Sequence, residues 1–207
     1  MKFSLIKVDN SKKLKALSRN KVNFLKKEED ASLFHFNKFD NDLFHAVFNV
    51  NDEYQIGTKK LGKQYNYAYS SLINFFFLLS NNYALIEHLN EKYKNEVLDY
   101  INNKTNAKLK AAYIDNSIII NLYRSLSGTV KKIEYTNNDD ELFDKDFVSD
   151  GEFYEIANAY TIDRLTLLVD KQFLSITKKG KITIDNSDEG FLIKFTKRIL
   201  DAIEQGF

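Results

Sequence analysis

The sequence predicts an α+β fold with a mixed sheet, and three observations support this. Apolar residues alternate with polar ones in several segments, which is the pattern of half-buried strands. Other segments repeat apolar residues every three or four positions, as the buried stripe of a helix does. Gly, Asn, Asp and Ser mark the boundaries in a chain of 207 residues without proline. We expect one domain over residues 1–207, with the turn at 80–82 as the seam if it forms two lobes.

A β-hairpin is predicted over residues 33–50, where apolar residues recur at every second position. A three-residue loop keeps these residues on one face and pairs Phe36 with Phe44. The same register sets His35 opposite His45 on the other face. Two imidazoles across a strand pair could hold a metal, but no spacing supplies the further ligands that such a site needs. We therefore expect polar residues on the wetter face of a hairpin, and no metal site.

The remaining elements follow from the same patterns. The N-terminal part predicts a strand and then a short basic helix, over 3–8 and 12–19. Further strands are expected at 53–58, 72–79, 83–89, 109–114, 130–135 and 161–169. The continuously apolar segment 72–79 also fits a buried helix. The stretch 137–155 predicts an acidic connector with a short helix near its end.

Two helices in the middle of the chain make the central order β-α-β-α-β. Asn90 is the expected N-cap of a helix that ends near residue 103. The next helix begins after Asp115 or Asn116 and is closed by Gly128 at the C′ position. A unit of this order often forms a partly parallel sheet covered by helices. The chain then ends with a hairpin and a helix, over 173–185 and 187–204.

The composition excludes several classes of protein. The absence of cysteine removes disulfides, thiolate nucleophiles and cysteine-based metal sites. The apolar stretch at the N-terminus is too short for a signal peptide, and the longest one, residues 72–79, is too short to span a bilayer. We expect a cytoplasmic protein that does not insert into membranes. The richness in Asn, Lys, Ile, Phe and Tyr suggests AT-rich codons, as in a bacterium or its phage.

Charge is distributed unevenly, although the net charge is only +1. Residues 2–27 carry nine basic side chains and one acid, whereas residues 139–155 carry eight acids and one lysine. A basic segment can follow a phosphate backbone, and alternating tyrosines can stack on bases. The candidate residues for binding nucleic acid or another partner are Lys12, Lys13, Lys15, Arg19, Lys59, Lys60, Lys63, Tyr65, Tyr67 and Tyr69. The candidate acidic partner surface consists of Asp139, Asp140, Glu141, Asp144 and Asp146. Alternatively, the lysines only solubilise the surface or pair with the acidic segment.

No recognised catalytic motif occurs in the chain. The seven glycines are scattered, so neither a dinucleotide-binding nor a phosphate-loop pattern is present. There is also no Gly-x-Ser-x-Gly sequence. We assign no catalytic residue, metal ligand or cofactor, and His88 is expected to be structural.

The leading functional hypothesis is a non-enzymatic binding subunit of a bacterial protein or nucleoprotein assembly. Its basic N-terminal region and acidic segment 139–155 would dock to partners of opposite charge, with a protein partner expected and nucleic acid as another candidate. A role in antiviral defence or a mobile element is suggested only by the composition. Two alternatives stay open: a metal-dependent nuclease or hydrolase, and a phage-type inhibitor whose acidic segment mimics nucleic acid.

Overall fold

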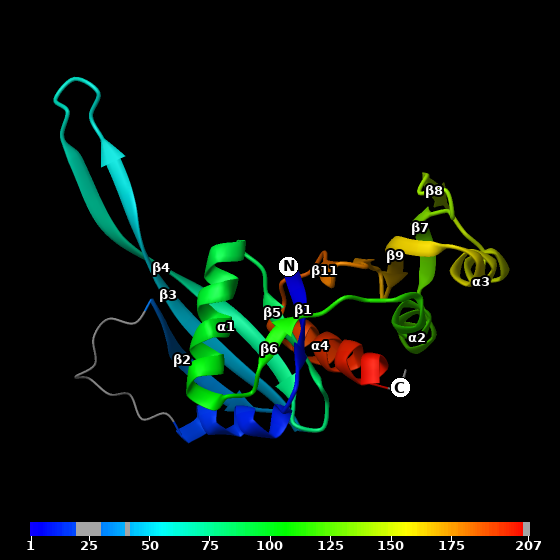
Figure 1. The fold of residues 1–207 in the computed structure, drawn as a ribbon, viewed down its shortest axis with the longest axis horizontal. Helices are drawn as coiled ribbons and strands as arrows, with labels where there is room; N and C mark the ends of the chain where they lie inside the picture. The colour runs from blue at the N-terminus through cyan, green and yellow to red at the C-terminus, as the bar shows by residue number, and fades with distance from the viewer. Residues whose placement is uncertain (20–29, 40–41, 205–207) are drawn as a thin grey trace.

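The computed structural model describes residues 1–19, 30–39 and 42–204, and it confirms the α+β class (Figure 1). Within these residues, eleven strands form one sheet in the order β2-β3-β4-β5-β1-β11-β10-β9-β7-β8, and β6 pairs with β1 outside this path. Helices lie on both faces of the sheet.

The elements are bounded as follows. The strands are β1 (Lys2–Val8), β2 (Ala31–Lys38), β3 (Leu43–Gly57), β4 (Gln64–Leu78), β5 (Tyr83–Glu87), β6 (Leu109–Ala111), β7 (Thr129–Thr136), β8 (Leu142–Asp146), β9 (Thr161–Val169), β10 (Gln172–Thr177) and β11 (Lys181–Ile184). The helices are the 3-10 helix η1 (Ser11–Arg19) and the α-helices α1 (Glu91–Thr105), α2 (Asn116–Leu126), α3 (Asp150–Ala159) and α4 (Glu189–Glu204).

The central β-α-β-α-β order predicted a partly parallel sheet, and this prediction is wrong. Every strand pair among the described residues is antiparallel. The strands β5 and β6, on either side of α1, do run in the same direction, but each pairs with β1 and not with the other. The N-terminal strand therefore separates the two strands that the local pattern predicted as parallel neighbours.

The sheet separates two hydrophobic cores. On one face, η1 and α1 pack over β2–β5 and bury residues such as Phe48, Phe75 and Ile101. On the other face, α2, α3 and α4 cover the second core, to which Phe153 and Ile199 belong. The alternating side chains of β1 contribute to both cores, because successive residues of a strand point to opposite faces. The sheet is continuous across the turn at 80–82, since β4 and β5 pair on either side of it.

The register predicted for the first hairpin is wrong. Phe36 pairs with Ala46, and His35 pairs with Val47 and not with His45. A bulge between Leu33 and His35 adds one residue to β2, which turns Leu33 inward and leaves the side chain of Phe34 68% exposed. Near the turn, Lys38 pairs with Phe44, and the backbone N–H of Phe39 donates to the carbonyl of Leu43 over 2.8 Å, so the hairpin closes one residue later than predicted. Residues 40 and 41 lie outside the described part.

Helix boundaries follow local capping chemistry. Asn90 caps α1, as predicted, by accepting a hydrogen bond from the backbone N–H of Tyr93. Asp115 does the same for α2, but the left-handed residue at its C-terminal end is Ser127 (φ 50°) and not Gly128. A Cβ on Gly128 would lie only 2.6 Å from Cγ2 of Val169. Close packing against β9 is therefore what requires glycine at this position.

The short helix predicted near the end of the acidic connector is confirmed as α3, but the connector also contains a strand that the sequence did not predict. Residues 142–146 form strand β8, which pairs with β7, and α3 begins at Asp150 behind a capping box made by Ser149 and Glu152. The strand predicted at 161–169 and the C-terminal hairpin and helix are confirmed. Residues 12–19 are helical as expected, although in the 3-10 form.

Candidate functional site

The most prominent surface feature is a two-stranded ribbon formed by residues 51–70. Strands β3 and β4 pair along their entire length, from Leu43 opposite Leu78 to Gly57 opposite Gln64. Their distal part extends well beyond the helices and the rest of the sheet (Figure 1). We call this part, residues 51–70, the ribbon.

The two faces of the ribbon differ in chemistry. Register pairs Tyr54 with Tyr67 and Ile56 with Tyr65, and it places Tyr69 on the same face. The four tyrosine side chains are 63%, 55%, 46% and 55% exposed in the order Tyr54, Tyr67, Tyr65 and Tyr69, so none of them contributes to a core. The opposite face is mainly polar and carries Glu53, Gln55, Asn66, Ala68 and Ser70. The ribbon therefore presents one aromatic face to solvent.

The aromatic face of the ribbon is continuous with the face of β3 and β4 that is buried in the body of the protein. Nearer the body of the protein, the same face of β3 and β4 carries Phe48, Val50 and Ile73, all fully buried under η1 and α1. The cover ends at the N-terminus of α1, where the Tyr93 hydroxyl donates a hydrogen bond to Asp52 over 2.6 Å. Beyond that point the strands keep their alternation, and no described helix covers the tyrosines.

The tip of the ribbon is basic. It carries Lys59, Lys60 and Lys63 in a turn that Gly62 closes with a positive φ of 59°. Residues 54–67 contain these three lysines and no acid. Of the predicted binding residues, the structure thus brings together Lys59, Lys60, Lys63, Tyr65, Tyr67 and Tyr69, and it adds Tyr54, which sequence reasoning did not select.

The basic N-terminal residues lie elsewhere. Lys12, Lys13, Lys15 and Arg19 are on η1, which packs against the C-terminal end of α1, where the Lys13 Nζ donates to the carbonyl of Asn106 over 3.2 Å. Because the ribbon begins at the N-terminal end of this helix, about 20 Å of helix separates the two basic regions. Of the other lysines in the basic segment, Lys2 and Lys7 are on β1, and those at positions 21, 26 and 27 lie outside the described residues.

The acidic residues lie on the opposite side of the molecule from the ribbon (Figure 1). Asp139, Asp140 and Glu141 occupy the turn before β8, and Asp144 and Asp146 are on β8 itself. Some of the acids in residues 139–155 are used within the fold: Asp144 pairs with Lys132 at 2.7 Å, and Glu152 pairs with Lys145 at 2.5 Å. Lys145 and the capping Ser149 lower the pKa of Glu152 to about 2. Among the described residues, no ion pair joins this segment to η1.

His45 belongs to a buried polar network in place of the predicted histidine pair. Its Nε2 lies 2.8 Å from Oδ1 of Asn74, whose amide Nδ2 donates to Glu87 over 2.6 Å. The imidazole stacks on Phe76 with ring centroids 4.4 Å apart. Burial lowers the pKa of His45, against the opposing effect of the Asn74 hydrogen bond. The described residues contain no group of three or more acids, histidines or cysteines placed to hold a metal ion.

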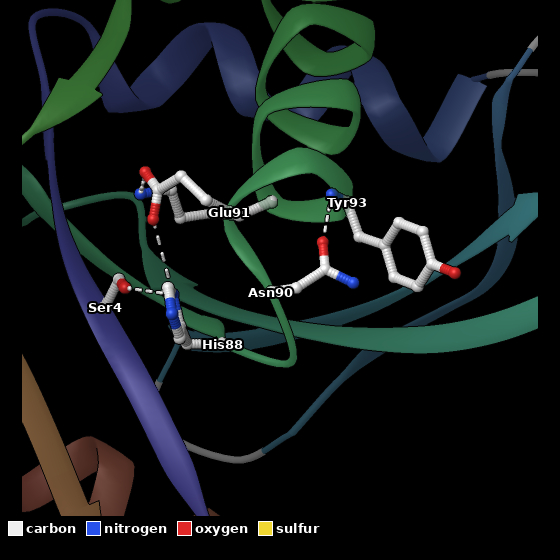
Figure 2. A network of polar contacts seen from close by, with 6 residues as sticks. Ser4, His88, Asn90, Glu91 and Tyr93 are labelled. Atoms are coloured by element: carbon white, nitrogen blue, oxygen red, sulfur yellow. Dashed lines mark hydrogen bonds and ion pairs between the residues drawn. The ribbon is translucent and has the colours of Figure 1, made fainter.

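His88 lies in a second polar network, which Figure 2 shows at the start of α1. Its Nδ1 is 3.1 Å from the Ser4 hydroxyl and 4.0 Å from a carboxylate oxygen of Glu91, which also pairs with Lys94. Burial and the positive charge of Lys181 lower the pKa of this histidine. The sequence predicted a structural His88 near Asn90; Glu91 and Lys94 are close to it in the chain, whereas Ser4 and Lys181 come from distant strands.

Comparisons with known proteins assign no family to this chain: no family model matches it, and no curated protein does. Among the described residues, no helix has the length and apolar character needed to cross a membrane.

Proposed function

We propose that the protein is a binding subunit that holds single-stranded nucleic acid on the aromatic face of the ribbon. The observation that carries this proposal is the placement of four exposed tyrosines on one face of a projecting ribbon with three lysines at its tip. Aromatic side chains stack on bases of any sequence, and cations near them attract the phosphate backbone. The assembly in which such a subunit works is, as the composition suggests, a bacterial nucleoprotein complex.

The spacing of the tyrosines supports a single strand as the ligand. Alternate residues of a strand are about 6.8 Å apart, so Tyr65, Tyr67 and Tyr69 form a regular row. This distance is about two steps of a stacked nucleic-acid strand, whose bases are about 3.4 Å apart. A row of this kind offers stacking partners to every second base of a stacked strand or to successive bases of a stretched one. In a duplex the flat faces of the bases are covered by their neighbours.

Lysine at the tip agrees with recognition of the backbone. Lysine is a point charge on a flexible stem, and it contacts phosphate without the paired donors with which arginine reads guanine. We therefore propose binding with little sequence preference. The basic residues of η1 are too far from the ribbon to belong to the same small site, and they are not part of this proposal.

The test is fluorescence anisotropy with labelled single-stranded and duplex oligonucleotides of the same length. We expect the single strand to bind more tightly, and the double variant Tyr65→Ala with Tyr67→Ala to weaken binding at least tenfold, since each stacked base contributes about 1–3 kcal/mol. Tyr113→Ala is the matched control, because Tyr113 is 78% exposed and lies off the ribbon.

The lysines have a separate readout. Replacing Lys59, Lys60 and Lys63 with Gln should reduce the slope of log affinity against log salt by about 2, because each phosphate contact on a single strand contributes about 0.7. Equal binding by the tyrosine variant and the Tyr113→Ala control would refute the proposal. So would a preference for duplex, or a wild-type protein that binds neither oligonucleotide but self-associates through the ribbon.

A further inference from the structure

A second surface, independent of the ribbon, lies where β1, β11, β10 and β9 run side by side. Register places Lys2 next to Thr183, and Thr183 next to Ser175. One row further along, Ser4 lies beside Lys181, and Thr177 lies beside Arg164. These side chains point to one face of the sheet because their positions alternate in step across four strands.

This face contains a cavity of about 450 Å³. Three cationic side chains line it, namely Lys2, Arg164 and Lys181, together with the hydroxyls of Ser175, Thr177 and Thr183 and the imidazole of His88. No acidic residue is among the lining residues. A cavity of this size is in the range of small-molecule sites, which is about 300–1,000 Å³.

The cations are only partly neutralised. Arg164 pairs with Glu134 at 3.2 Å. Lys2 and Lys181 form no ion pair with any of the described residues, although Lys181 lies close enough to His88 to lower its pKa. An anion would supply the missing negative charge, and the hydroxyls of Ser175 and Thr183 would donate to its oxygens. The hydroxyl of Thr177 already donates to the carbonyl of Lys181 over 3.4 Å.

His88 adds a donor at the edge of the cavity. The Ser4 hydroxyl lies 3.1 Å from Nδ1 (Figure 2). When it donates to Nδ1, the neutral imidazole carries its proton on Nε2, which makes no hydrogen bond to the described residues and can donate to a ligand. Besides burial and Lys181, the charges of Lys94 and Lys2 lower the pKa of His88, whereas Glu91 raises it. The potential at this imidazole is therefore positive on balance.

We propose that this cavity binds a phosphate group, either as the free ion or as a phosphate monoester of a small molecule. Phosphate presents several strong acceptor oxygens and up to two negative charges, which match the three cations and the hydroxyls of Ser175 and Thr183. The free ion fills only part of the cavity, so the remaining space would accommodate the organic part of a monoester.

The experiment is a titration of the protein with inorganic phosphate, ribose 5-phosphate and ribose, followed by calorimetry and by the NMR signals of His88. We expect both phosphates to bind and ribose to show no binding. Tighter binding of ribose 5-phosphate would identify a monoester as the preferred form, and equal binding would identify the free ion. Bound phosphate should raise the pKa of His88, because a nearby negative charge favours the protonated imidazole.

Variants distinguish phosphate binding in this cavity from nonspecific attraction of anions to the basic surface. Lys2→Gln and Lys181→Gln should each weaken phosphate binding by about tenfold or more, as expected for a charge-assisted hydrogen bond. Lys179→Gln is the matched control, because Lys179 is exposed on the same hairpin but does not line the cavity. Absence of binding by both phosphates, an unchanged His88 pKa, or equal losses in Lys179→Gln and Lys181→Gln would each overturn the proposal. Amide NMR spectra of every variant establish that it is folded.

Discussion

The hydroxyl of Tyr93 donates a hydrogen bond to the carboxylate of Asp52 over 2.6 Å, at the point where the covered sheet becomes the exposed ribbon. Tyr93 is in the first turn of α1, and Asp52 is on β3 next to the first ribbon residue. This bond joins the last helix contact on the aromatic face to the base of the projecting strands. It is therefore positioned to hold the ribbon at a fixed angle to α1.

A Tyr93→Phe variant tests this relationship. The hydrogen bond from Tyr93 is the main cause that lowers the pKa of Asp52, followed by the backbone N–H of Glu53. Removing the hydroxyl should raise the Asp52 pKa toward its ordinary value, which a carboxyl NMR titration measures. Amide exchange at residues 51–54 should also become faster. An unchanged pKa would mean that the bond is absent in solution.

We predict that substitutions at the neighbouring positions 127 and 128 have opposite effects on stability. Ser127→Gly should stabilise the protein by about 1 kcal/mol, because a non-glycine residue at positive φ is strained. Gly128→Ala should destabilise it by about 1–3 kcal/mol, because the added Cβ would meet Val169 and the carbonyl of Leu168. Urea unfolding measures both. If Gly128→Ala were neutral, the close packing described for β9 would be wrong.

The buried network of His45, Asn74 and Glu87 should make the stability of the protein sensitive to substitution of Asn74. Asn74→Ala removes both the amide donor to Glu87 and the partner of His45. Because Glu87 is only 8% exposed, we expect a loss of about 1–3 kcal/mol in the free energy of unfolding. The control is Asn66→Ala, whose side chain is exposed on the ribbon and should change stability by less than about 0.5 kcal/mol. Similar losses in both variants would contradict this account.

Stability should decrease when the pH falls below about 6.5, the ordinary pKa of histidine. The folded state lowers the pKa of both His45 and His88, so below this pH the unfolded chain binds more protons than the folded one. Protons therefore favour unfolding, increasingly down to the folded-state pKa values. Replacing His45 with Gln should reduce the difference in unfolding free energy measured between about pH 7.5 and pH 5. A variant with the same pH dependence as the wild type would show that His45 does not contribute.

Local patterns predicted most of the elements correctly. Asn90 and the apolar stripe after it define α1, and the period-two pattern of residues 161–169 gives the bounds of β9. These predictions succeed because capping and amphipathic periodicity depend on residues close together in the chain. The same is true of Tyr65, Tyr67 and Tyr69, whose alternation already placed them on one side of a strand.

Other features depended on contacts between distant residues. The bulge that turns Phe34 outward and the separation of His35 from His45 depend on how β2 pairs with β3. The insertion of β1 between β5 and β6 decides that the sheet is antiparallel there.

The two proposed binding surfaces illustrate this division. The residues of the ribbon lie within one segment of the chain, so the sequence by itself determined their chemistry, namely alternating tyrosines beside a basic turn. Only the tertiary structure decided that this segment projects from the body with its aromatic face uncovered, because that depends on where the N-terminus of α1 lies over the sheet. The proposed phosphate cavity depends entirely on tertiary contacts, since Lys2, His88 and Lys181 meet only when β1 pairs with β5 and β11. A local sequence pattern cannot indicate a contact between residues more than eighty positions apart. Such residues come together only when the strands of the whole sheet pack side by side.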